Sequence, residues 1–113
     1  MMIQRVLTII ALFSLGAAKI PASELPAEQL DSLFEEACRV ARDGKGPSID
    51  KETKLFFWGR YKIITWASND VKDSEEHASE KRAYMSSIVG LSREQALREY
   101  LHRMDELRPD WRK

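Results

Sequence analysis

Apolar residues recur at steps of three and four along the segment 27–44. That spacing places them on one face of an α-helix. Gly44, Gly46 and Pro47 follow the last apolar residue, and they predict that the helix ends there. The predicted apolar face consists of Leu30, Leu33, Phe34, Ala37, Cys38 and Ala41.

The second predicted helix is apolar around most of its circumference. It starts near Ser48 or Asp50, either of which can cap it, and runs to about Ala67. Its centre reads "FFWGRYKIITW", eleven residues with five aromatic rings and two cations. A helix that is apolar on every side belongs inside a core larger than a chain of this size supplies. We therefore expect one face to meet a partner or a ligand, although the rings can also be core residues while Lys62 reaches water.

Two more helices are predicted in the C-terminal half of the chain. The third spans about 76–89, follows a polar segment and carries only a thin apolar stripe. Gly90 separates it from the fourth, which opens with Ser92 and Gln95 at the spacing of a capping box. No strand is predicted, so we expect an all-α domain built as a four-helix bundle. The apolar stripe of the fourth helix consists of Ala96, Leu97, Tyr100, Leu101, Met104 and Leu107.

The first 18 residues differ in composition from the rest. One charge, Arg5, precedes a mostly apolar run at 6–15, and small residues follow at 16–18. This is the layout of a secretory signal peptide cleaved near residue 18, and the apolar run is shorter than the roughly 20 residues of a membrane-spanning helix. The expected division is a signal peptide at 1–18 and a single domain at 19–113. An uncleaved anchor and an extension without function are the competing interpretations.

The charge balance argues against a nucleic-acid partner. The chain has 18 basic and 18 acidic residues, and removal of residues 1–18 would leave 17 against 18, a net charge of −1. A protein that coats phosphate backbones usually has a strong basic excess. The single cysteine, Cys38, allows no internal disulfide, and we expect it to be a small buried apolar residue.

No catalytic or metal-binding pattern is found in the sequence. His77 falls in a polar segment and His102 on the fourth helix, and neither has the spacing of a metal ligand. The Glu-Glu pairs at 35–36 and 75–76 are expected on solvated surfaces rather than as an acid–base pair. A nucleophile with a neighbouring base and a glycine-rich phosphate loop are also not found. We therefore expect a protein that is not an enzyme.

Three segments, taken in order, resemble the acyl-CoA-binding protein family. They are "FEEACRVAR", "LFFWGRYKIIT" and "GLSREQALREYLHRMDEL", and the resemblance covers residues 33–111. Members of this family are four-helix bundles that bind long-chain fatty acyl-CoA esters. The resemblance implies a carrier and pool former for long-chain acyl-CoA in lipid metabolism, with no cofactor beyond that ligand.

The resemblance implies ligand-binding residues on all four helices. A basic residue of the first helix corresponds to Arg42, and the ligand run of the second helix to residues 58–62. The lysine of the third helix corresponds to Lys81, and the ring of the last helix to Tyr100. The implied ligand-binding residues are Arg42, Trp58, Gly59, Arg60, Tyr61, Lys62, Lys81 and Tyr100.

These positions suit the chemistry of an acyl-CoA ester. Lys62 and Lys81 would neutralise the 3′-phosphate region, and Trp58 or Tyr61 would pack against the adenine. The acyl chain would lie in an apolar groove between helices. Long chains should therefore bind better than short ones, and free coenzyme A should bind weakly.

Two features depart from the family pattern. The connection between the second and third helices is about three residues shorter than usual and lacks an Arg-Pro-Gly-like turn. Arg82 follows Lys81 where the family usually has Trp. Either Tyr84 or Met85 could fill the space of that ring, and Arg82 could instead assist the phosphates.

Two other functions are compatible with the sequence. One is a secreted helical interaction protein whose ligand groove is degenerate, and the other is a carrier of a related amphiphile such as a lysophospholipid. The expected location is the secretory pathway or the exterior if the signal peptide is used, and the cytoplasm otherwise. A monomer is expected, and the resemblance allows transient contact with a membrane or with an enzyme that uses acyl-CoA.

Overall fold

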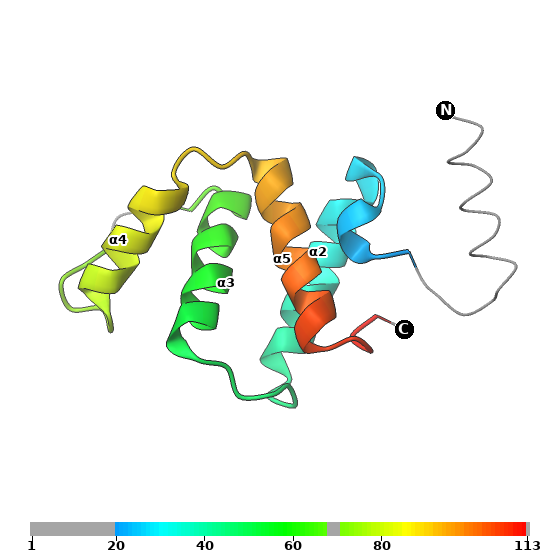
Figure 1. Ribbon diagram of the computed structural model, residues 1–113, viewed down its shortest axis with the longest axis horizontal. Coiled ribbons are helices and arrows are strands. Elements are labelled where there is room, and N and C mark those ends of the chain that lie inside the picture. Colours follow the sequence, from blue (N-terminus) through cyan, green and yellow to red (C-terminus); the bar gives the residue numbers. More distant parts are fainter. Residues whose placement is uncertain (1–19, 68–70, 113) are drawn as a thin grey trace, which may run out of the picture.

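The computed structural model describes residues 20–67 and 71–112 (Figure 1). Within those ranges the protein is all-helical and contains no strand, and the four predicted α-helices are confirmed. The predicted signal peptide at 1–18 lies outside the described residues. The elements in chain order are the 3-10 helix η1 (Ala22–Glu24) and the α-helices α2 (Ala27–Arg42), α3 (Lys51–Ile64), α4 (Ala78–Ile88) and α5 (Arg93–Leu107).

Helix α5 is the centre of the arrangement. Helices α2 and α3 each pack closely against α5, whereas their backbones do not approach each other closely, and α4 packs against α3. Figure 1 shows α4, α3 and α5 following one another across the molecule. Because the backbones of α2 and α3 are held apart, their side chains determine how much of the space between the two helices is filled.

Three aromatic rings meet where α2, α3 and α5 come together. The ring of Tyr100 on α5 makes edge-to-face contacts with Phe34 of α2 and Phe57 of α3, at centroid distances of 5.0 and 4.8 Å. Each such contact adds about 0.5–1.5 kcal/mol to the burial of apolar area. The largest fully buried side chains around these rings are Leu30, Ile64 and Leu101.

Helix α3 ends at Ile64, before the predicted end near Ala67. Trp66 adopts the left-handed conformation, with a φ of 57°. Its N–H donates to the Ile63 carbonyl at 3.3 Å, and the N–H of Ala67 donates to the Lys62 carbonyl at 3.1 Å. These two bonds form a Schellman motif, which satisfies the last carbonyls of a helix and ends it.

Side-chain caps account for the starts of two helices. The carboxylate of Asp50 accepts a first-turn N–H of α3, and the hydroxyl of Ser92 does the same for α5. Both caps satisfy N–H groups that have no partner within the helix. Helix α4 starts at Ala78 rather than near residue 76, because His77 has a φ of 56° and cannot continue a helix.

A buried arginine joins α3 to both α4 and α5. The guanidinium of Arg60 forms an ion pair with Glu99 of α5 at 2.9 Å and donates to the Tyr84 hydroxyl of α4. It also lies over the Phe56 ring, 3.6 Å from the centroid. Beside it, a Cβ on Gly59 would lie 2.7 Å from the Tyr84 ring, so α3 and α4 approach closely only because this residue is glycine.

The segment 20–25 belongs to the folded domain, which the helical pattern did not predict. The N–H of Ala22 donates to Asp105 of α5 at 3.0 Å, and Arg98 donates to the carbonyls of Ser23 and Leu25 at 2.9 Å. Trp111 donates to the other oxygen of Asp105 at 2.8 Å. The two ends of the described chain are therefore fastened side by side on α5 (Figure 1).

Candidate functional site

An open groove of about 570 Å³ lies between α2 and α3. The space exists because both helices rest on α5 while their backbones stay apart. The rings of Phe34 and Tyr61, with centroids 5.9 Å apart, supply much of its apolar surface. Cys38 and Ile64 also line it.

Cations outnumber anions along this groove. The side chains of Arg39 and Arg42 make no hydrogen bond or ion pair within the part of the chain that the structure describes. Arg93 pairs with Asp31 at 2.5 Å, and the hydrogen bond from Arg93 lowers the pKa of Asp31. Glu35 is the second carboxylate of the groove. Two arginines are thus available for an anionic ligand.

A cluster of one indole and two ammonium groups lies on the side of α3 that faces α4. The Lys62 Nζ is 5.8 Å from the centroid of the Trp58 ring, and the Lys81 Nζ of α4 is 5.4 Å from it. Both distances are within the range of a cation–π interaction. Lys81 also pairs with Glu75 at 3.2 Å, and hydrogen bonds from the Lys72 N–H and from Lys81 lower the pKa of Glu75.

Tyr61 connects the groove to this cluster. It lines the groove, and it follows Trp58 by three residues and precedes Lys62 on α3. Residues three or four apart are neighbours on a helix surface. Tyr61 is 39% exposed, so a ligand can reach it.

Tyr100 lies beneath the groove rather than on its surface. It is 5% exposed, and its hydroxyl oxygen is 4.0 Å from the Cys38 sulfur. Burial raises the pKa of Tyr100 and also that of Cys38. Both groups are therefore protonated at neutral pH, and Cys38 lacks the thiolate that a reactive cysteine needs.

The structure places two of the residues implied by the family resemblance in the groove and three in the Trp58 cluster. Two others, Gly59 and Arg60, are not brought there. Gly59 is buried under α4, and Arg60 is 8% exposed because its guanidinium is used for the contacts to Glu99 and Tyr84. The five surface residues are Arg42, Trp58, Tyr61, Lys62 and Lys81.

Arg82 does not reach the Trp58 cluster. Its guanidinium donates to the Val71 carbonyl at 2.7 Å and pairs with Asp73, so it fastens the segment that precedes α4. Met85 is buried and Tyr84 covers Gly59. Both side chains therefore pack inward.

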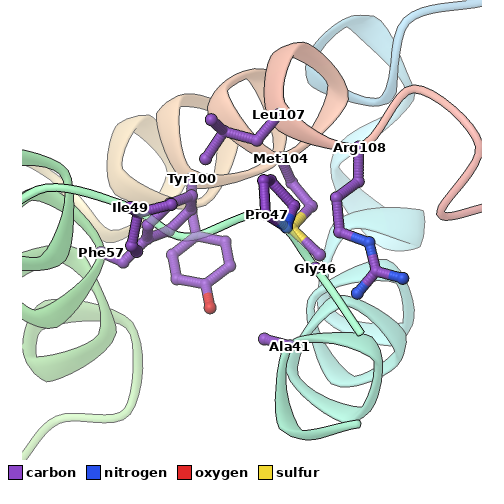
Figure 2. A pocket seen from close by; sticks show the side chains of 9 residues that line it. All are labelled: Ala41, Gly46, Pro47, Ile49, Phe57, Tyr100, Met104, Leu107 and Arg108. Carbon is purple, nitrogen blue, oxygen red and sulfur yellow. The ribbon is translucent and has the colours of Figure 1, made fainter. Parts of the chain in front are cut away.

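A smaller apolar hollow lies under the connection between α2 and α3 (Figure 2). Its volume is about 190 Å³, and Tyr100 stands between it and Cys38 of the open groove. Arg108 is at its edge, donating to the Val40 carbonyl at 3.1 Å and pairing with Asp43 at 3.2 Å. The apolar side chains that line the hollow are Ala41, Pro47, Ile49, Phe57, Met104 and Leu107.

Sequence reasoning missed three residues of the open groove, Arg39, Trp66 and Arg93. Arg39 could have been found, because it precedes Arg42 by three residues and so shares its side of α2. Trp66 depends on the left-handed turn after α3. Arg93 is brought in by tertiary packing, where its Nε donates to the Ile64 carbonyl at 2.8 Å.

Comparison of the chain with protein-family models, curated proteins and solved structures found no match. The family resemblance therefore depends on the residues themselves and on their placement.

Neither a metal site nor a membrane-spanning element is found in the described ranges. Residues 20–67 and 71–112 contain no group of three histidine, cysteine or acidic side chains arranged to hold a metal ion. Over the same ranges, each helix is too short or too polar to cross a bilayer.

Proposed function

We propose that the protein binds long-chain fatty acyl-CoA esters and acts as a non-enzymatic carrier and reservoir for them. The observation that carries this proposal is the pair of lysines beside one indole. Lys62 and Lys81 come from different helices, and both ammonium groups lie within 6 Å of the Trp58 ring. A flat ring beside two cations suits a ligand that joins a purine base to phosphates.

The head group of the ligand would occupy the Trp58 side of α3. The adenine would stack on Trp58 or Tyr61, and the 3′-phosphate would bind Lys62 and Lys81. A charge-assisted hydrogen bond is worth about 1.5–3 kcal/mol when it is shielded from water. Lys81 would have to share its ammonium group between the phosphate and Glu75, with which it forms a partly buried ion pair.

The remaining phosphates and the acyl chain would lie along the groove between α2 and α3. Arg39 and Arg42 have no ion-pair partners within residues 20–67 and 71–112, and they could bind the pyrophosphate. The acyl chain would cover the rings of Phe34 and Tyr61, and the end of the acyl chain would reach toward the hollow in Figure 2. Burial contributes about 0.8 kcal/mol per CH₂ group, so affinity should rise steeply with chain length.

Calorimetric titration tests this proposal. The full chain is titrated with palmitoyl-CoA below its micelle concentration, with free coenzyme A and with palmitate. We expect one-to-one binding of palmitoyl-CoA, weak binding of coenzyme A, and a loss of about tenfold in Lys62→Ala. Lys45→Ala is the matched control, because it removes one exposed cation from the connection between α2 and α3.

Three outcomes would point elsewhere. Equal affinity for palmitate or a lysophospholipid would indicate a general amphiphile carrier that does not read the coenzyme head group. Equal losses in Lys62→Ala and Lys45→Ala would mean that only net charge matters. No binding of any amphiphile would favour the secreted interaction protein. In the first two cases the proposed location still follows residues 1–18: the secretory pathway or the exterior if they are used as a signal peptide, and the cytoplasm otherwise.

A further inference from the structure

The residue at the left-handed position after α3 is unusual. In a Schellman motif this position is most often glycine, because a side chain crowds the backbone at positive φ. Here it is Trp66, with a φ of 57°, and the two hydrogen bonds of the motif are both made. The chain thus holds its bulkiest side chain in a backbone conformation that disfavours side chains.

Packing within the protein does not compensate for this strain. The side chain of Trp66 is 78% exposed, the highest value among the large apolar residues that the structure describes. Among the residues that the structure describes, its one ring contact is with the Arg93 guanidinium, 5.8 Å from the ring centroid. An exposed indole in a strained position is most readily explained by a contact outside the chain.

Trp66 lines the groove beside Arg93, and Arg39 and Arg42 line the same groove further along α2. Arg39 and Arg42 form no ion pair with any residue that the structure describes, while the charge of Arg93 is balanced by Asp31. Glu35 is the remaining carboxylate, so this side of the molecule has a small excess of positive charge. It therefore complements a weakly negative surface.

We propose that Trp66 docks the open groove on the surface of an anionic lipid membrane. An indole prefers the headgroup level of a bilayer, where its ring is buried and its N–H meets polar groups. Arginines along the same groove add attraction to anionic lipids. A protein partner fits less well, since a single exposed ring offers little of the area that a stable protein interface requires. Docking there would place the groove against a source of amphiphiles, whichever amphiphile it carries.

Vesicle binding of the full chain tests the proposal. We compare the wild type with Trp66→Gly, using large vesicles of neutral phosphatidylcholine with and without phosphatidylserine. Trp66→Gly should lower partition into anionic vesicles about tenfold, since one indole no longer enters the interface. Its thermal midpoint should stay the same or rise, because glycine is the favoured residue at this position. Lost binding then cannot be attributed to unfolding.

Two further variants locate the contact. Val89→Ser removes another strongly exposed apolar side chain (67%) and should leave partition unchanged. Arg39→Gln combined with Arg42→Gln should lower only the binding that depends on phosphatidylserine, by about fivefold per arginine. Any direct contribution of residues 1–18 is common to all these chains and cancels in the comparison.

Fluorescence reports the position of the ring directly. The difference between the spectra of the wild type and Trp66→Phe isolates Trp66, and brominated lipids should quench this difference signal when vesicles are added. Absence of quenching, or equal losses of binding in Trp66→Gly and Val89→Ser, would overturn the proposal. Neither result depends on whether palmitoyl-CoA binds, so this test can fail independently of the proposed function.

Discussion

Replacement of Arg60 by alanine should destabilise the domain strongly. Arg60 is 8% exposed and is the point at which α3 is joined to α4 and α5. Two guanidinium nitrogens lie 2.9 Å from one oxygen of Glu99, and Nη1 donates to the Phe56 carbonyl at 3.3 Å and to the Tyr84 hydroxyl. The substitution removes all of these contacts and leaves Glu99 without its cation.

The magnitude follows from the burial of the two partners. Removing one member of a fully buried ion pair costs about 3–5 kcal/mol. The Glu99 side chain is 31% exposed and keeps a hydrogen bond from Gln95 at 2.7 Å. Water and Gln95 therefore reduce the energetic cost of leaving the Glu99 carboxylate without Arg60. The loss of packing over the Phe56 ring adds to the cost. We therefore expect Arg60→Ala to lower the free energy of unfolding by about 3 kcal/mol.

Urea denaturation followed by far-UV circular dichroism measures this loss. Lys51→Ala is the matched control, because Lys51 also joins α3 to another helix, through Glu80 at 3.2 Å, but both side chains are well exposed. It should change the free energy of unfolding by less than about 1 kcal/mol. A loss below about 1 kcal/mol in Arg60→Ala, or equal losses in the two variants, would refute the reasoning.

Three further predictions concern the ligand and acid stability. Lys81→Ala should weaken palmitoyl-CoA binding about fivefold or more in the calorimetric titration but leave palmitate binding unchanged; equal losses for both ligands would contradict a contact with the head group. Ala41→Phe should fill the hollow of about 190 Å³ and lower the affinity for palmitoyl-CoA more than the affinity for octanoyl-CoA. Equal losses for the two esters would mean that the end of the acyl chain lies elsewhere. The folded-state pKa of Asp31 lies below its ordinary value because of Arg93, so the pair stabilises the fold fully above about pH 4 and loses its effect as the pH falls further. Urea midpoints at pH 7 and pH 3 should therefore differ less in Asp31→Asn than in the wild type, and an identical difference would exclude this contribution.

The number and order of the helices could be predicted from sequence. The spacing of apolar residues defines one face of α2 and of α5, and the caps at Asp50 and Ser92 mark the starts of α3 and α5. These signals are local, because a helix is built from contacts between residues three and four apart. The resemblance also pointed to Trp58, Lys62 and Lys81, which the structure places in one cluster.

The assignment of α3 residues to particular partners needed the tertiary structure. All sides of this helix carry aromatic or cationic residues, so the helical pattern by itself does not distinguish a ligand face from a packing face. The position of α4 turns Gly59 and Arg60 into packing residues, and the separation of α2 from α3 leaves Tyr61 accessible.

The sequence by itself determined that the chain forms amphipathic helices in a given order, since helix periodicity and capping act over a few residues. Only the tertiary structure decided which cations remain available. Arg60 and Arg42 are both arginines, yet Arg60 forms an ion pair with Glu99, whereas Arg42 has no ion-pair partner among the described residues. The same holds for Trp66, whose exposure follows from a backbone turn. Long-range packing sets burial and charge pairing, and residue type alone does not encode them.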